Sequence, residues 1–126
     1  MAATQRIDEE PHLAYDRVHL SAFFEKKSPE SLQIADRAEY AKFGVTLHTG
    51  KKINAIDREQ RTVQDTEGNV YGFDTLVLST GSIPFVPPIP GSEKRGVFVY
   101  RTIEDVQNIL AYAKDCSSCA VIGGGL

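Results

Sequence analysis

The sequence has few residues that could bind a metal or form disulfides. Its 126 residues include two cysteines and three histidines. Cys116 and Cys119 have the C-x-x-C spacing, which occurs in redox pairs and in half of a zinc site, but also without any function. There is no second cysteine pair, and His12, His19 and His48 lack ligand spacing. We therefore expect the two cysteines to be reduced and without a functional role.

The sequence also lacks long runs of one kind of residue. Its formal charge is −3, from 14 Lys and Arg against 17 Asp and Glu, and the two signs are interspersed. No basic run could track a nucleic-acid backbone, so nucleic acid is not an expected partner. The N-terminus has no apolar core of a signal peptide, and no apolar run approaches the length of a membrane span. We expect no membrane contact and a cytoplasmic protein.

The remaining composition is that of an ordinary folded protein, with 41% apolar and 25% charged residues. This balance favours a soluble globular chain of one domain at most. Residues 10–24 are expected to form an irregular loop. Asp36 and Glu39 form a capping-box pattern, which predicts a helix over 37–43, and Gly44 suits the left-handed position just after it.

Several short segments are expected to be strands. Residues 45–49 and 52–57 are strand-like. Residues 62–66 face 69–73 across a Glu67-Gly68 turn, which predicts a hairpin. The sequence therefore predicts a small antiparallel element in the middle of the chain.

A different kind of strand is predicted next. Residues 75–79 are nearly all apolar or β-branched, as is typical of a strand buried on both faces in a parallel sheet. This segment ends at Thr80-Gly81. Residues 82–91 contain four prolines, which exclude helix and central strand and indicate a stiff connector. A short strand is expected at 97–100.

The C-terminal part of the sequence predicts a helix and the start of a nucleotide-binding unit. Thr102 is the expected N-cap, and the apolar face of the helix comprises Val106, Ile109, Leu110 and Ala113. Residues 120–122 are expected to form a strand that enters a Gly-x-Gly at Gly123 and Gly125. In a dinucleotide-binding βαβ unit, the first such glycine makes the tight turn and the second lets the backbone approach the pyrophosphate.

Three features together indicate the fold class. They are the strand that ends at Thr80-Gly81, the proline-rich connector, and the strand that enters Gly-x-Gly about forty residues later, as in flavoproteins with two dinucleotide-binding domains. We predict an α/β, incomplete Rossmann-like FAD/NAD-binding fold with a small antiparallel β element. The alternative for Thr80-Gly81 alone is a simple tight turn.

Four stretches carry a more specific resemblance. They are EEPHLAYDRVHLS at 9–21, LVLSTGSIPFVPPIPG at 76–91, VFVYRTIEDV at 97–106 and VIGGGL at 121–126. Together they resemble the large subunits of NAD(P)H nitrite reductases. The Thr-Gly and Gly-x-Gly parts are shared by the wider superfamily that resembles the pyridine-nucleotide-disulfide reductases.

The resemblance implies roles for individual residues. Glu9 matches the acidic residue that accepts hydrogen bonds from the adenosine ribose of FAD, with Glu10 as the alternative. Ile53 matches a position whose backbone lies against the adenine. Thr80 and Gly81 match a small-residue turn beside FAD. Arg101 matches an arginine near the phosphates of FAD, and its alternative is a surface salt bridge with Glu104 or Asp105.

The resemblance also shows departures from the family. The family places a glycine-rich phosphate loop about thirty residues before its acidic residue, and only MAATQRID precedes Glu9. The sequence therefore resembles a fragment truncated at both ends. Residues 1–99 would be a partial FAD-binding domain, and residues 100–126 the linker helix and first strand of a domain that binds NAD(P)H. The loop at Tyr15, Asp16, Arg17 and His19 matches the family, and we expect it to pack over the cofactor.

The implied parent reaction is the reduction of nitrite to ammonia, with electrons passing from NAD(P)H to FAD and then to an iron–sulfur cluster and sirohaem. A small subunit or another redox partner is expected for that parent. One alternative is a flavoprotein reductase resembling ferredoxin reductases, rubredoxin reductases or NADH oxidases. Another is an inactive gene fragment without catalytic activity of its own.

Overall fold

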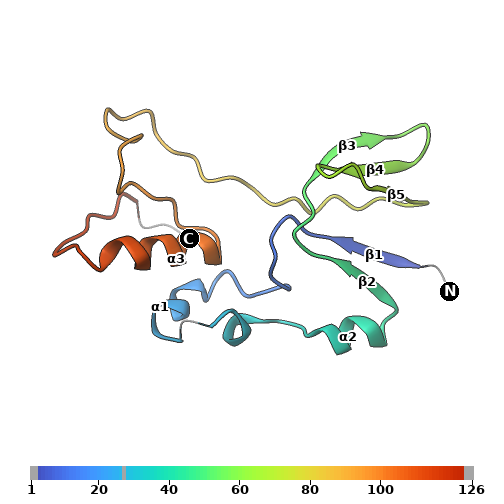
Figure 1. Ribbon diagram of the computed structural model, residues 1–126, viewed down its shortest axis with the longest axis horizontal. Helices are drawn as coiled ribbons and strands as arrows, with labels where there is room; N and C mark the ends of the chain where they lie inside the picture. The colour runs from blue at the N-terminus through green and yellow to red at the C-terminus, as the bar shows by residue number, and fades with distance from the viewer. Residues whose placement is uncertain (1–2, 27, 124–126) are drawn as a thin grey trace.

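The structure, a computed structural model, describes residues 3–26 and 28–123. It contains two separate sheets (Figure 1). Strands β1 (Thr4–Ile7) and β2 (Val45–His48) pair in parallel, with Thr4 opposite Val45 and Ile7 opposite His48. The other sheet is antiparallel and contains β3 (Ile53–Asp57), β4 (Thr62–Asp65) and β5 (Val70–Gly72). The parallel pair confirms the α/β character, and the antiparallel sheet confirms the predicted hairpin.

Local hydrogen bonds and one glycine explain where the helix before β2 begins and ends. Helix α2 (Arg37–Lys42) begins with a complete capping box. The amide of Glu39 donates to Asp36 Oδ1 at 2.8 Å, and the amide of Asp36 donates to Glu39 Oε2 at 2.9 Å. Gly44, at φ +68°, then turns the chain into β2. The prediction of this helix and its end is confirmed.

The turn between β4 and β5 is built around Asp65, a buried residue that is 1% exposed. Its carboxylate accepts hydrogen bonds from the amides of Glu67 and Asn69, from the Asn69 side chain and from the Tyr71 hydroxyl. Gly68 has φ +89° in this turn. A buried carboxylate with this many donors is well compensated, so it stabilises the hairpin.

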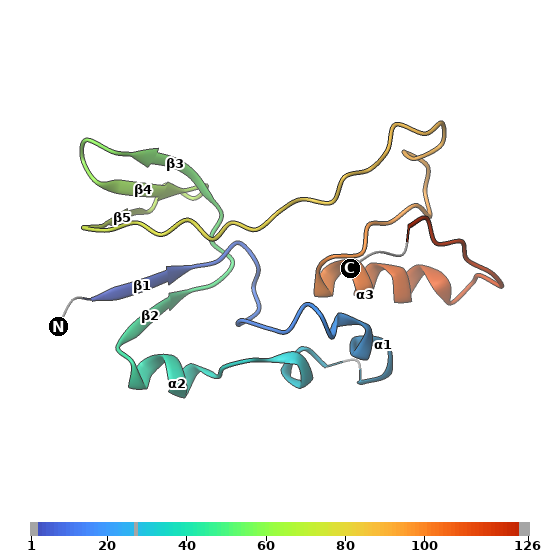
Figure 2. The ribbon, with the colours of Figure 1, turned by 180° about the vertical axis from the view of Figure 1, so that it is seen from behind.

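The main apolar core lies between the N-terminal loop and α3 (Ile103–Ala113), away from both sheets (Figure 2). Three short elements from that loop take part: η1 (Leu20–Ala22), α1 (Phe23–Lys26) and η2 (Pro29–Leu32). The buried core residues are Tyr15, Leu20, Phe23, Leu32, Ile103 and Val106. Residues about eighty positions apart in the sequence therefore hold α3 in place.

Helix α3 begins as predicted. The Thr102 hydroxyl accepts from the Asp105 amide at 3.1 Å, and Asp105 Oδ2 accepts from the Thr102 amide at 2.8 Å. Val106 is fully buried, whereas Ala113 at the end of the predicted apolar face is exposed. None of the described helices has the length and apolarity that crossing a membrane requires.

Three predicted strands are wrong. The segments 75–79, 97–100 and 120–122 are neither strand nor helix. Val77 is 78% exposed, although its sequence context is typical of a buried strand. A strand needs a partner for its backbone amides and carbonyls, and none of these segments pairs with a strand in the described part of the chain. The connector at 82–91 is irregular, as predicted.

Candidate functional site

Glu9 and Ile53 lie close together at the carboxyl end of the parallel strands. The Asp8 amide donates to the His48 carbonyl at 2.9 Å, and the Lys51 amide donates to the Asp8 carbonyl at 2.7 Å. These bonds join the end of β1 to the start of β3, which begins at Ile53. The side chain of Glu9 is exposed and accepts from Lys52 Nζ at 2.7 Å. Glu9 is therefore paired with the residue that precedes Ile53, and we call this region, Glu9 with Ile53, the first corner.

A second corner joins Gly81 to Arg101. Arg101 Nη1 donates to Ser82 Oγ at 3.1 Å. Gly81 has φ +69°, and a Cβ built on it would lie 2.7 Å from Arg101 Nη2. Only a glycine lets the guanidinium approach the backbone this closely. Thr80, next to Gly81, is exposed. Three predicted site residues from either side of the connector thus lie together.

The alternative role of Arg101, a surface salt bridge with Glu104 or Asp105, is not found in the described part of the chain. Among the described residues, the guanidinium makes no salt bridge with Glu104 or Asp105. Asp105 instead accepts from the backbone amide of Arg101, at 3.0 Å. The guanidinium is therefore a cation without an acidic partner in this part of the chain.

Glu10, Tyr15 and Arg17 form a cluster that the residue patterns did not predict. Tyr15 Oη donates to Glu10 Oε2 at 2.6 Å and accepts from Arg17 Nη1 at 2.7 Å, and Arg17 Nη2 donates to Glu10 Oε1. Burial and the Glu10 hydrogen bond raise the pKa of Tyr15. Glu10 is therefore held by Tyr15 and Arg17, whereas Glu9 is exposed and pairs only with Lys52 among the described residues. Only the resemblance over 9–21 drew attention to this loop.

Gly123 is the one C-terminal glycine of the predicted site that the structure describes, and it contacts neither corner. Gly123 has φ +90°, and a Cβ built there would meet nothing within 4 Å. Gly125 lies outside the described residues. Val121 and Ile122, which should precede the turn in a buried strand, are exposed. The predicted nucleotide role of Gly123 and Gly125 stays a prediction.

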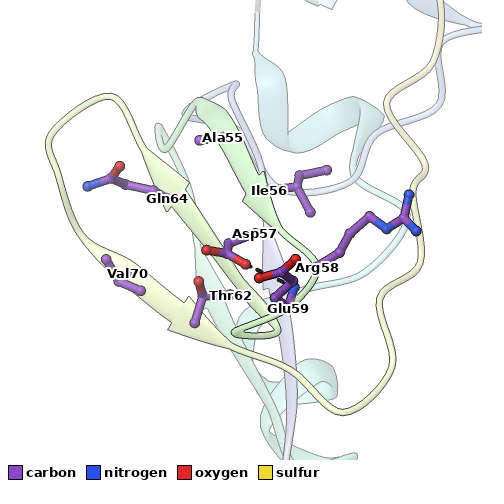
Figure 3. Close-up of a pocket in the computed structure, with 8 residues that line it drawn as sticks. All are labelled: Ala55, Ile56, Asp57, Arg58, Glu59, Thr62, Gln64 and Val70. Carbon is purple, nitrogen blue, oxygen red and sulfur yellow. Dashed lines mark hydrogen bonds between the residues drawn. The ribbon is translucent and has the colours of Figure 1, made fainter.

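Two of the hollows on the described surface bear on the position of the site. One lies on the antiparallel sheet and is lined by Ala55, Ile56, Asp57, Arg58, Glu59, Thr62, Gln64 and Val70 (Figure 3). It contains no predicted site residue, and Asp57 Oδ1 accepts from the Glu59 amide at 2.9 Å within the turn. The smaller hollow includes Glu10, Tyr15 and Arg17 in its lining. The two corners and the cluster of Glu10, Tyr15 and Arg17 therefore form the candidate site.

The cysteines and possible metal ligands give no site. Cys116 and Cys119 are both free and exposed. Within residues 3–26 and 28–123, no three His, Cys, Asp or Glu side chains are grouped so that they could hold a metal ion.

Comparisons with known proteins identify the family of the chain. A family model described as pyridine nucleotide-disulphide oxidoreductase matches residues 2–126. The chain is 46% identical over 118 residues to the nitrite reductase [NAD(P)H] large subunit of Klebsiella oxytoca, covering 94% of this chain and 12% of that protein. It is 41% identical over 118 residues to the nitrite reductase (NADH) large subunit of Escherichia coli, covering 94% of this chain and 14% of that protein.

A solved structure shares the fold. The ferredoxin reductase for the CYP199A2 system from Rhodopseudomonas palustris superposes with a TM-score of 0.81 at 25% identity, over 90% of this chain and 28% of that one. The predicted α/β, Rossmann-like fold is therefore confirmed. The chain spans a small part of the length of each protein that it matches.

Proposed function

The chain belongs to the pyridine nucleotide-disulphide oxidoreductase family, and on that premise we propose that it carries part of the FAD site of an NAD(P)H-dependent nitrite reductase large subunit. The observation that carries this proposal is the corner of Gly81 and Arg101. Two segments on either side of a proline-rich connector bring together a small-residue turn and a cation that has no acidic partner among the described residues. Such a corner suits a dinucleotide phosphate.

The chemistry of the two corners fits FAD. Glu9 follows a parallel strand at its carboxyl end, where nucleotides bind in open α/β sheets. Its exposed carboxylate can accept hydrogen bonds from ribose hydroxyls. Ile53, at the start of β3, would offer backbone groups to the adenine. Thr80 and Gly81 leave room beside the backbone, and Arg101 would bind phosphate oxygens. Bound FAD would accept a hydride from NAD(P)H.

The boundaries and partners are part of the same proposal. Residues 1–99 would belong to the FAD-binding domain, and residues 100–126 to the beginning of the NAD(P)H-binding domain, with Gly123 and Gly125 at its phosphate turn. In a complete nitrite reductase, electrons would continue to an iron–sulfur cluster and sirohaem, with a small subunit or another redox partner.

Identity favours nitrite reductase over a simpler flavoprotein reductase. The two nitrite reductase subunits are 46% and 41% identical to the chain, whereas two ferredoxin–NAD(+) reductase components of dioxygenase systems, compared in the same way, are 30% and 31% identical. The reading frame around this segment distinguishes the two. Downstream cysteines spaced for an iron–sulfur cluster and sirohaem support nitrite reductase, and their absence from a full-length frame supports the simpler reductase.

A chimera tests the FAD site. The matched 118-residue stretch of the Klebsiella oxytoca protein is replaced by this chain, and the bound FAD and nitrite consumption with NAD(P)H are measured. We expect the chimera to carry FAD and to consume nitrite. Glu9→Gln and Arg101→Met should each reduce the bound FAD, because each removes a group that would contact it.

Glu59→Gln is the matched control, because Glu59 lies in the β3–β4 turn outside both corners. Equal FAD content in Glu9→Gln, Arg101→Met and Glu59→Gln would contradict the assigned site.

A further inference from the structure

Both backbone polar groups of Arg101 are hydrogen-bonded to side chains. Its amide donates to Asp105 Oδ2 at 3.0 Å, and its carbonyl accepts from Arg17 Nη1 at 3.1 Å. The first bond belongs to the N-terminal cap of α3. The second joins residues that are 84 positions apart. With both groups held, the direction in which the Arg101 side chain leaves the backbone is restricted, and it reaches Ser82 and Gly81.

Arg17 is itself held by the cluster of Glu10, Tyr15 and Arg17, which we call the brace. Two of its nitrogens bond to Tyr15 Oη and Glu10, and its guanidinium carbon lies 4.7 Å from the centre of the Tyr15 ring. Tyr15 is 8% exposed and packs in the core with Ile103 and Val106. The brace therefore links the Arg101 carbonyl to a residue of the core. Although the Arg17 side chain is 41% exposed, three hydrogen bonds restrain its guanidinium, to Tyr15 Oη, to Glu10 and to the Arg101 carbonyl.

The two arginines differ in whether an acidic side chain compensates their charge. Glu10 compensates the charge of Arg17 through the salt bridge. Arg101 has no acidic side-chain partner among the described residues. An incoming phosphate would therefore be attracted to Arg101, and Arg17 would have to leave Glu10 to bind it directly.

We propose that Arg17 is a positioning residue: with Glu10 and Tyr15, it holds the Arg101 backbone so that the Arg101 guanidinium lies over Gly81, ready for a phosphate group. This inference rests on the proposed function, since the role of Arg101 comes from there. It assigns a purpose to the loop at 15–17, which the residue patterns left unexplained.

The first measurement uses the chain without any ligand. Arginine side chains are labelled with ¹⁵N, and the Nε–Hε signal of Arg101 is identified by its loss in Arg101→Lys. We expect Arg17→Leu to shift or broaden this signal at a temperature where the variant is folded. An unchanged signal in a folded Arg17→Leu would overturn the proposal.

Arg6→Leu is the matched control. Arg6 also bonds a carboxylate and a tyrosine hydroxyl, Asp8 and Tyr40, each at 2.6 Å. Its side chain is 37% exposed, against 41% for Arg17. Because Arg6 does not contact Arg101, its loss should lower stability without moving the Arg101 signal. An equal shift in both variants would make the effect a general loss of structure and would overturn positioning.

A milder variant covers the case in which Arg17→Leu fails to fold. Glu10→Gln keeps the side-chain length and removes the charge that holds Arg17. We expect it to displace the Arg101 signal by less than Arg17→Leu would, and Arg17→Lys to restore part of the original signal relative to Arg17→Leu. No displacement in Glu10→Gln, or unfolding of both Arg17→Leu and Glu10→Gln, would make the brace a stabilising element only and would overturn the proposal.

The second measurement titrates ADP, which contains the adenosine and diphosphate groups of FAD, while the Arg101 signal is followed. We expect Arg17→Leu to weaken ADP binding roughly tenfold relative to Arg6→Leu, a typical loss when a charged contact is misplaced. Equal ADP affinity in the two variants would overturn the proposal. An absent ADP response in the unaltered chain would contradict the proposed function at Arg101, while the ligand-free signal would still decide the role of Arg17.

Discussion

The Arg101 guanidinium occupies the space that a side chain on Gly81 would need, since a Cβ there would lie 2.7 Å from Arg101 Nη2. Residues on either side of the connector thereby constrain each other. Gly81 also has φ +69°, a conformation that residues with a Cβ adopt at a cost.

Gly81→Ala should therefore have two effects. The left-handed backbone should cost about 1–2 kcal/mol of the free energy of unfolding, and the new methyl group should displace the Arg101 side chain. Gly50→Ala is the control, because Gly50 has φ +70° and an open Cβ position. Urea unfolding should show similar losses in both variants, whereas the Arg101 side-chain NMR signal should move only in Gly81→Ala. Movement in both, or in neither, would contradict the contact.

Gly96→Ala should loosen the segment 96–98, which follows the connector, from α3. A Cβ on Gly96, at φ +91°, would lie 2.8 Å from the hydroxyl of Tyr112, whose ring also contacts Phe98. Gly68→Ala is the matched control, with φ +89° and nothing within 4 Å of its Cβ. We expect urea unfolding to show a greater loss in Gly96→Ala, by about 1 kcal/mol, as is typical of mild overpacking. Equal losses would show that the segment 96–98 can move away from Tyr112 without cost.

Stability should fall in acid because of Asp65. Burial alone would raise the pKa of this carboxyl, but hydrogen bonds from Asn69, Tyr71 and the Glu67 amide outweigh it and lower the pKa to about 2. The ordinary value is 3.8. The unfolded chain then binds more protons than the folded one as the pH falls from about 4 to about 2. The stabilisation is complete above that window and is lost within it.

Urea unfolding between pH 7 and pH 2 measures this effect. Asp65→Asn should be less stable than the unaltered chain at pH 7 and should lose less stability on acidification, because residue 65 no longer titrates. A fall of the same size in Asp65→Asn would assign the acid sensitivity to other carboxylates.

The 126-residue chain purified alone should not retain FAD or oxidise NAD(P)H. Within residues 3–26 and 28–123, no glycine-rich turn leads from a strand into a helix, so the aligned amides that bind a pyrophosphate are not provided there. Without those amides, Glu9, Ile53, Thr80 and Arg101 would support only weak nucleotide binding, too weak to retain FAD through gel filtration. The chain is mixed with FAD, separated by gel filtration, and its absorption spectrum is recorded before and after NADH is added.

Yellow protein with one FAD per chain that bleaches with NADH would contradict this expectation. The chain would then complete its site by another route, such as self-association. If the chain retained FAD but did not bleach with NADH, only the prediction that it does not retain FAD would be wrong.

Sequence patterns predicted the elements that form through local bonds. The capping boxes at Asp36 and Thr102 and the turn at Glu67-Gly68 each involve residues within a few positions of one another. Their geometry therefore follows from nearby residue types. The segments at 75–79, 97–100 and 120–122 were predicted by apolar pattern alone and are not strands, because a strand also requires a distant partner for its backbone.

The sequence by itself determined the local caps and turns, the fold class, and the residue types suited to a dinucleotide: the carboxylate of Glu9, the small turn at Thr80-Gly81 and the guanidinium of Arg101. Only the tertiary structure decided which of these residues meet. It committed Glu10 to Tyr15 and Arg17, left Glu9 exposed, and placed Arg101 over Gly81. The physical reason is that these contacts join residues far apart in the chain, whose approach depends on how the core around Tyr15, Ile103 and Val106 packs.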